Sequence, residues 1–311
     1  PYISTHMPNR RENTISRMKE LVVQKYNHPS IVVWGLSNEI TMHGTGAVEI
    51  KSGYGLTLQD ELKMLRVIKK LKSLSALTIK ATFLGAHAVP AGITKEAYMA
   101  TLLNEMIPQV VEEKLADYCD VFCEKNYFTK EEAIKILLQA KKYGLKAKVH
   151  AEQLSHSGGV EAGVECDAIS VDHLEFVNDN DIVLLKKSEI MATILPGAQW
   201  FLQLQNPPVR KMIDAGLPIA IASDYNPGSS PSGNMNFMTS IACVQYKLTP
   251  EEAINASTLN SAYAMGLGLT HGSITVGKEA NLFITKEISD YSFIPYSFAN
   301  NLIDTVVVGG K

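Results

Sequence analysis

Residues 129–153 have the sequence TKEEAIKILLQAKKYGLKAKVHAEQ, and this stretch decides the fold class. Apolar residues recur three and four positions apart in Lys130–Tyr143, which predicts a helix that begins after Thr129 and is closed by Gly144. The apolar run Ala147–His150 then predicts a short strand, and polar residues follow it directly. A helix that leads into a buried strand is the repeating unit of a parallel α/β sheet.

The same alternation recurs on both sides of this stretch. Further helices are predicted at Leu58–Leu71, Lys95–Leu115 and Pro208–Ala215. Further strands are predicted at Ala47–Ile50, Leu77–Phe83, Cys119–Phe122, Ala168–Val171, Ile190–Leu195 and Pro218–Ala222. A barrel wrapped in helices needs about 250 residues, so a chain of 311 residues is long enough for one. The tail differs, because Gly272–Thr285 and Ile303–Gly309 predict short strands in a small β appendage.

The composition excludes several classes of protein. An apolar fraction of 46%, a charged fraction of 20% and a net charge of -3 exclude a disordered chain. Lys and Arg (29) do not outnumber Asp and Glu (32), so we expect no nucleic-acid partner. No stretch approaches the roughly 18 apolar residues of a membrane helix, so we expect no membrane partner. Four cysteines in a chain of this length favour a reducing, cytoplasmic location.

Three polar residues at predicted strand ends are candidates for metal chemistry. His150, His173 and Asp224 each end such a strand, and active sites of α/β barrels occupy the edge where strands end. Imidazole nitrogen and carboxylate oxygen can hold a zinc or iron ion that keeps an open position for water. The alternative for each residue is a buried, hydrogen-bonded structural role, and two histidines with one aspartate are an incomplete ligand set.

Six ordered motifs resemble the imidazolonepropionase family of the amidohydrolase superfamily. They are Glu49–Leu56, Thr82–Pro90, His150–Ser155, Asp172–Glu175, Leu195–Ala198 and Ser223–Ser229. The resemblance runs from about residue 44 to the C-terminus. It implies a TIM-like (β/α) barrel over residues 44–270 and a remnant of a small β-sandwich domain over residues 271–311. The first barrel strand would be missing or replaced.

The resemblance also implies a reaction and a set of roles. The reaction is hydrolysis of the ring C–N bond of 4-imidazolone-5-propanoate to N-formimidoyl-L-glutamate in histidine degradation, with one Zn²⁺ or Fe ion. His150 and Asp224 would bind the ion, and Asp224 would also accept the proton of the attacking water. His173 would stabilise the developing charge. Gln153 stands where some members have glutamate, so it could orient water or substrate but could not accept a proton.

Substrate contacts are expected from two further loops and from the loop after the last strand. The residues implied are Tyr54, His87, Gln153, Asn226, Gly228 and Ser229. At Gly228 the expectation has a physical reason, because a backbone N–H can approach an anion closely where no Cβ intervenes. The partner would be a small-molecule substrate, and a homodimer is compatible with the resemblance.

The family pattern is incomplete in this sequence. The family supplies two more metal ligands as a His-x-His pair ending the first barrel strand, and the sequence has no His-x-His. An arginine for the substrate carboxylate and the N-terminal part of the β appendage are also missing. We therefore expect little activity from this chain, because two ligands rarely hold a catalytic metal.

Residues 1–43 resemble a different family. A predicted helix at Arg11–Lys25 and a predicted strand at Ile31–Leu36, ending in Ser37-Asn38-Glu39, are similar to the barrel of β-galactosidase/β-glucuronidase-type glycoside hydrolases. Glu39 would be the acid/base, but a retaining glycosidase needs a second carboxylate about 5–5.5 Å away, and no matching segment exists. The alternatives to an imidazolonepropionase are therefore a glycoside hydrolase or a non-functional chimeric product joined near Met42.

Overall fold

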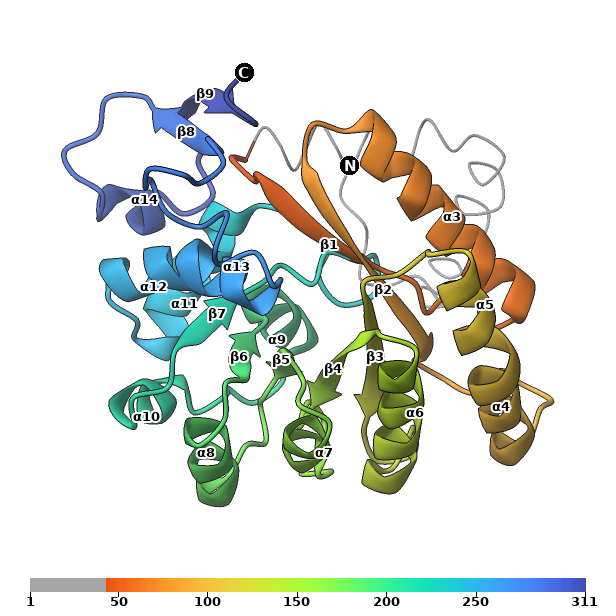
Figure 1. Cartoon of the computed structure of the whole chain (residues 1–311). Coiled ribbons are helices and arrows are strands. Elements are labelled where there is room, and N and C mark those ends of the chain that lie inside the picture. Colours follow the sequence, from red (N-terminus) through yellow and green to blue (C-terminus); the bar gives the residue numbers. More distant parts are fainter. Residues whose placement is uncertain (1–42) are drawn as a thin grey trace, which may run out of the picture.

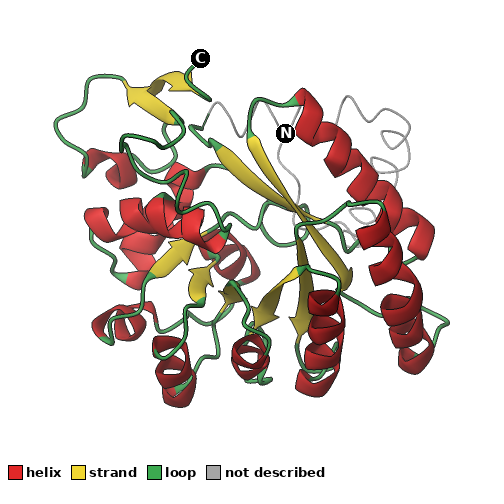
Figure 2. Ribbon diagram, in the orientation of Figure 1, coloured by secondary structure: helices red, strands yellow, loops and turns green. Residues whose placement is uncertain are grey.

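Seven parallel strands dominate the computed structural model, which describes residues 43–311. They form one sheet in sequence order, curled into a TIM-like half-barrel with helices on its outside (Figures 1 and 2). The strands are β1 (Ala47–Lys51), β2 (Thr78–Ala86), β3 (Tyr118–Cys123), β4 (Lys146–Ala151), β5 (Ser170–His173), β6 (Met191–Ile194) and β7 (Ile219–Ile221). All pairs are parallel, as predicted. Within the described residues, β1 and β7 are the two edges of the sheet.

Helices connect successive strands and supply the outer layer. They are α3 (Leu58–Leu74), α4 (Lys95–Thr101), the π-helical turn η1 (Leu102–Met106), α5 (Ile107–Glu112), α6 (Lys130–Lys142), α7 (Gly159–Glu165), α8 (Asp179–Lys186), α9 (Pro196–Leu202), α10 (Val209–Asp214), α11 (Met235–Tyr246), α12 (Pro250–Ser257), α13 (Leu259–Ala264) and α14 (Phe293–Tyr296). None of these helices is long and apolar enough to span a membrane.

Local sequence signals explain where most elements begin and end. Thr129 starts α6 through a capping box with Glu132, and Gly144 follows the helix with φ +87°. The single helix predicted over Lys95–Leu115 is wrong in its middle, where η1 separates α4 from α5. Pro108 is the second residue of α5, directly after Ile107, and because proline has no N–H it removes one α-helical hydrogen bond there. Strand β5 begins at Ser170, two residues later than predicted.

The two faces of the sheet differ sharply in polarity. Val149 of β4 is fully buried in the hydrophobic core, whereas its neighbour Lys148 is 2% exposed and directs its ammonium 2.7 Å from Glu49 of β1. Alternate residues of a strand point to opposite faces. The outer face therefore packs against the helices, and the inner face of the half-barrel carries buried charges.

The C-terminal residues form a separate two-stranded antiparallel sheet of β8 (Leu282–Thr285) and β9 (Ile303–Val307). This confirms short strands in the tail, but the strand predicted from Gly272 begins only at Leu282. The residues before it are turns, with Gly272 at φ +88° and Gly277 at φ +91°. These are left-handed conformations that a strand does not adopt. The domain boundaries 1–43, 44–270 and 271–311 stay predictions.

Several predictions fall on residues outside the described range. They are the helix at Arg11–Lys25, the strand at Ile31–Leu36 and the acid/base role of Glu39. The replacement of the first barrel strand therefore also stays a prediction.

Asp117, just before β3, supports a prediction about acid stability. Its carboxylate accepts hydrogen bonds from the Ala81 N–H (2.8 Å) and from Lys72 (2.6 Å) of α3. Burial opposes its ionisation, but these two partners lower the pKa overall. A lowered pKa contributes stability above the ordinary aspartate range that is lost as the pH falls through the folded value. Asp117→Asn should therefore lower the free energy of unfolding by about 1 kcal/mol at pH 7, since the side chain is partly exposed.

Urea unfolding of both proteins at several pH values measures this effect. The difference between wild type and Asp117→Asn should begin to shrink below about pH 4, where the carboxylate of the unfolded chain takes up a proton, and shrink further as the pH falls through the lowered folded pKa. Asp167→Asn is the control, because the Asp167 side chain is 81% exposed. A constant difference down to pH 2 would show that the charge of Asp117 is not the cause.

Candidate active site

The three residues predicted at strand ends lie at the carboxyl-terminal edge of the half-barrel. His150 is in β4, His173 ends β5, and Asp224 follows β7. The rings of His150 and His173 have centroids 5.2 Å apart. Burial lowers the pKa of His173, but Glu175 and then the nearby Asp224 raise it. His173 (φ +88°) and Asp224 (φ +48°) both have left-handed backbone, a strain that often accompanies functional sites.

His87 extends this group of rings. Its Nδ1 lies 3.1 Å from the carbonyl oxygen of Gly53, so that nitrogen carries the proton of the neutral ring. The His87 ring is 6.4 Å from His150 and 5.3 Å from Tyr54. Burial, followed by the nearby His150, lowers the pKa of His87. A neutral His87 can therefore present Nε2 as a hydrogen-bond acceptor.

A buried glutamate that the motifs did not single out orders the Tyr54 loop. The carboxylate of Glu61 accepts hydrogen bonds from the backbone N–H groups of Gly53 (2.9 Å), Gly55 (2.8 Å) and Leu56 (3.0 Å). Glu61 is fully buried in the first turns of α3. The signal that could have found it is a glutamate on the apolar face of the predicted helix. Tyr54 is thus carried on a fixed loop, with 61% of its surface exposed.

The loop after β7 is organised by Asn226. Its Oδ1 accepts the N–H groups of Gly228 and Ser229, each at 2.8 Å, and its Nδ2 donates to the carbonyl oxygen of Asp224 at 2.7 Å. The Ser229 hydroxyl donates to Asp224 Oδ2 at 2.9 Å. The Gly228 N–H donates within this Asx turn, and the substrate contact expected at Gly228 stays a prediction. The loop holds Asp224 in position. Gln153, the remaining expected residue, is 9% exposed in the loop after β4.

A network of buried charges lies inside the half-barrel, and sequence reasoning missed it. Lys51 of β1 places its ammonium 2.6 Å from Asp120 of β3 and 3.0 Å from Asp172 of β5. His150 Nδ1 lies 3.0 Å from Asp120 Oδ1. Burial opposes ionisation of Asp172, but Lys51 and then Lys148 lower its pKa to about 2. The available signal was a charged residue at alternate positions of otherwise apolar strands.

Two groups of side chains have the composition of a metal site, and both have a simpler structural explanation. In Asp120, His150 and Asp172 the ligand atoms lie within 4.8 Å of one another, but the ammonium of Lys51 already pairs with both carboxylates. The Lys51 ammonium therefore neutralises the two carboxylates of this group without a metal ion.

The second group is Glu152, His156 and Asp181. Glu152 accepts the N–H of Val160 in the first turn of α7 at 3.2 Å, and Asp181 forms the capping box of α8. These carboxylates cap helices.

Glu175 is a buried carboxylate beside His173. It is 1% exposed, and neither side-chain oxygen has a hydrogen-bond partner among the described residues. Its Oε1 lies 3.8 Å from His173 Nδ1. Burial lowers the pKa of His173, but Glu175 and then Asp224 raise it overall. Burying a polar group without a partner is costly, and the His173 ring is the partner that this structure places beside Glu175.

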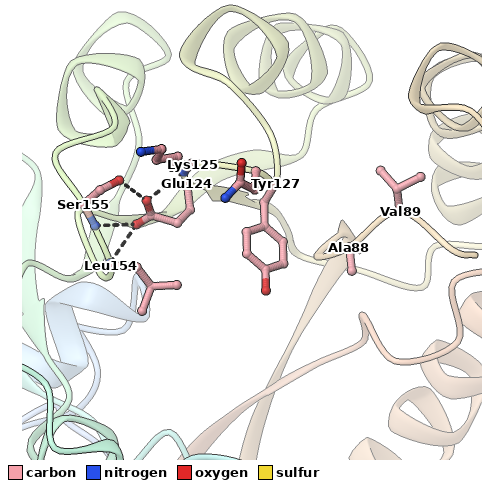
Figure 3. A pocket seen from close by; sticks show the side chains of 8 residues that line it. Ala88, Val89, Glu124, Lys125, Tyr127, Leu154 and Ser155 are labelled. Atoms are coloured by element: carbon pink, nitrogen blue, oxygen red, sulfur yellow. Dashed lines mark hydrogen bonds between the residues drawn. The ribbon is translucent and has the colours of Figure 1, made fainter.

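A cavity of about 660 Å³ opens on the same edge (Figure 3). It is lined by residues that follow β2, β3 and β4: Ala88, Val89, Glu124, Lys125, Asn126, Tyr127, Leu154 and Ser155. Glu124 closes one side by accepting the N–H groups of Leu154 (2.8 Å) and Ser155 (3.2 Å). The Phe122 ring lies between Tyr127 and His87, with centroids 4.5 Å and 5.8 Å away. The cavity therefore neighbours the histidine group.

Comparisons with known proteins agree with this architecture. The model of the amidohydrolase family matches residues 41–311. Imidazolonepropionase of Flavobacterium johnsoniae is 55% identical over 275 residues, which are 88% of this chain and 67% of the relative. Imidazolonepropionase of Thermoanaerobacter pseudethanolicus is 42% identical over 85% of this chain and 64% of its own length. The matched part thus spans about two thirds of these relatives.

Solved structures support the fold at much lower identity. A zinc-bound adenosine deaminase from Xanthomonas campestris is 16% identical and superposes with a TM-score of 0.68 over 91% of this chain and 70% of its own. The family model covers most of the chain, and the Flavobacterium johnsoniae relative is 55% identical over 88% of it. The chain therefore belongs to the amidohydrolase family and, within it, to the imidazolonepropionases.

Proposed function

We propose that residues 43–311 provide the substrate-facing and much of the metal-binding machinery of an imidazolonepropionase. The reaction is hydrolysis of the ring C–N bond of 4-imidazolone-5-propanoate to N-formimidoyl-L-glutamate. The observation that carries this proposal is the meeting of His150, His173 and His87 near Asp224, at one edge of a barrel whose sequence is 55% identical to an imidazolonepropionase. Hydrolysis of a C–N bond is the chemistry of this family.

Two of the side chains present, His150 and Asp224, offer donor atoms that fit a metal cofactor. Asp120 engages Nδ1 of His150, so Nε2 is the nitrogen that can ligate, and Asp224 adds a carboxylate oxygen. Nitrogen and oxygen donors of this kind suit Zn²⁺ or Fe, either of which we propose as the ion. When bound, such an ion lowers the pKa of a water molecule so that hydroxide is available near neutral pH.

Each remaining residue has a task that its surroundings support. Asp224, oriented by the Ser229 hydroxyl, accepts the proton of the attacking water. His173, whose pKa burial lowers but Glu175 raises, stabilises the negative charge that develops on the carbonyl oxygen of the imidazolone. Gln153 orients water or substrate, since an amide cannot serve as a base.

The substrate is held by the loops around the histidine group. Tyr54 and His87 contact it from the loops after β1 and β2. Asn226, Gly228 and Ser229 shape the opposite wall through their turn. We also propose that the protein is cytoplasmic and forms a homodimer. We expect neither nucleic acid nor a membrane as a partner.

A hybrid chain tests the proposal. Residues 1–42 would be replaced by the segment that precedes the matched region in the Flavobacterium johnsoniae relative, which restores a complete N-terminal part. Loss of the imidazolone chromophore would be followed with Zn²⁺ or Fe²⁺ added. We expect turnover by the hybrid and little or none by the present chain, which lacks His-x-His.

The test also covers the alternatives. A hybrid that is folded by circular dichroism, yet fails to turn over substrate with either metal, would contradict the proposed function. The glycoside hydrolase alternative rests on Glu39, which precedes the residue at which the family model begins. A chromogenic galactoside or glucuronide assay of the present chain tests that alternative directly.

A further inference from the structure

Asp120 is the partner of the proposed metal ligand His150, and its own contacts determine which atom it offers. It lies in β3, is fully buried, and receives the Lys51 ammonium at 2.6 Å on Oδ2. Paired with this ammonium, Asp120 is a carboxylate, which can only accept hydrogen bonds.

The geometry leaves His150 one way to satisfy this contact. Its Nδ1 lies 3.0 Å from Asp120 Oδ1, so Nδ1 must carry a proton and donate it. In a neutral imidazole the other nitrogen then has the lone pair. The two nitrogens point away from each other across the ring, so Nε2 is directed away from Asp120.

We propose that Asp120, anchored by Lys51, is a positioning residue that holds His150 as the neutral Nδ1–H tautomer and so presents Nε2 as a metal ligand. The tautomer assignment follows from the contact between His150 Nδ1 and Asp120 Oδ1 alone. The binding of a metal by Nε2 rests on the proposed function. A carboxylate that orients a metal-binding histidine is a common device, and its removal costs about 10–100-fold in metal affinity.

Further contacts hold Lys51, and through it Asp120, in place. Lys51 is itself held by Asp172 at 3.0 Å, and Asp172 accepts the Ser170 hydroxyl at 2.8 Å. Asp120, His150 and Asp172 stand on the neighbouring strands β3, β4 and β5, where His150 pairs in register with Asp172. Strand register sets these positions, so the imidazole cannot rotate without breaking its hydrogen bond to Asp120.

Long-range ¹⁵N NMR of the full chain labelled with ¹⁵N-histidine tests the tautomer without any metal or substrate. His150→Gln identifies the His150 signals. At pH 8 we expect a protonated Nδ1 and an unprotonated Nε2. A neutral Nε2–H tautomer, or a doubly protonated ring, would overturn the proposal even if no Asp120 variant folds.

Two substitutions then separate orientation from mere structural support. Asp120→Ala removes the acceptor, and we expect His150 to shift toward the Nε2–H tautomer. Asp120→Asn keeps a carbonyl oxygen, so the Nδ1–H tautomer should be retained. Asp117→Asn is the matched control, because Asp117 is also paired with a lysine but lies outside β3, directly before Tyr118. An Asp120→Ala protein that keeps the wild-type tautomer would contradict the assignment.

Zn²⁺ competition with a chromophoric chelator supplies a second readout. In the hybrid chain, whose N-terminal part comes from the relative, Asp120→Ala should weaken zinc affinity by about 10–100-fold, Asp120→Asn by less, and Asp117→Asn not measurably. Equal zinc affinities of the hybrid with and without Asp120→Ala would overturn the positioning role. If the tautomer and zinc results hold but the folded hybrid shows no turnover, the proposed reaction fails and the positioning role remains.

Discussion

Asp224→Asn in the hybrid chain should lower kcat/KM for the imidazolone substrate by about 10³-fold or more. The substitution keeps the size of the side chain and its contact with the Ser229 hydroxyl, but an amide cannot accept the proton of the attacking water. Loss of a general base alone costs about 10²–10⁴-fold. The weaker metal binding of an amide oxygen adds to this loss. The rate at which the imidazolone chromophore disappears, measured at several substrate concentrations and saturating Zn²⁺, gives kcat and KM separately.

The control for this prediction is Asp179→Asn. Asp179 is 78% exposed and pairs with Lys211 on the surface, so its substitution should leave kcat/KM unchanged. Both proteins should unfold at the same temperature as the hybrid itself, which excludes a folding defect. If Asp224→Asn retains activity within tenfold of the hybrid, Asp224 is not the base.

Lys51→Met should lower the free energy of unfolding by about 3 kcal/mol at pH 7. The substitution leaves Asp120 and Asp172 as buried carboxylates without their shared cation, together with Glu49, which lies 3.3 Å from the same ammonium. Removing one partner of a buried ion pair costs about 3–5 kcal/mol. We expect the lower end, because 24% of the Lys51 side chain is exposed. Urea or guanidinium unfolding, followed by circular dichroism, measures the change.

A surface pair and a double mutant identify the cause. Lys141→Met breaks the exposed pair with Asp167 and should cost less than 1 kcal/mol. Lys51→Met/Asp120→Asn should be more stable than Lys51→Met alone, since it removes one of the uncompensated charges. If the losses of unfolding free energy of the two single variants simply add in the double mutant, repulsion between unpaired carboxylates does not cause the instability of Lys51→Met.

Much of the half-barrel could be predicted because its signals are local. Apolar spacing and the Thr129 cap place α6, and the apolar run before His150 places β4. Prediction failed where a local signal was weak or was overruled. The π-helical turn before Pro108 interrupts a continuous apolar pattern, and Gly272 and Gly277 end the predicted strand through their backbone conformation.

The candidate site was only partly visible in the sequence. His150, His173 and Asp224 could be named because strand ends share one edge of a parallel sheet. The partners of these residues could not be named in the same way. Lys51 and Asp120 are 69 residues apart, and nothing in their local sequence specifies that they meet.

The sequence by itself determined the strand–helix alternation, the edge that carries the polar residues, and the resemblance to imidazolonepropionases. These depend on periodicity and on short motifs, which are properties of neighbouring residues. Only the tertiary structure decided that Lys51 serves as the cation between Asp120 and Asp172, that Asp120 engages His150, and that Asn226 uses the Gly228 N–H. The physical reason is that the curl and register of the sheet bring distant strands within hydrogen-bonding distance. Oppositely charged side chains on these strands then pair, although no pattern in the local sequence indicates the pairing.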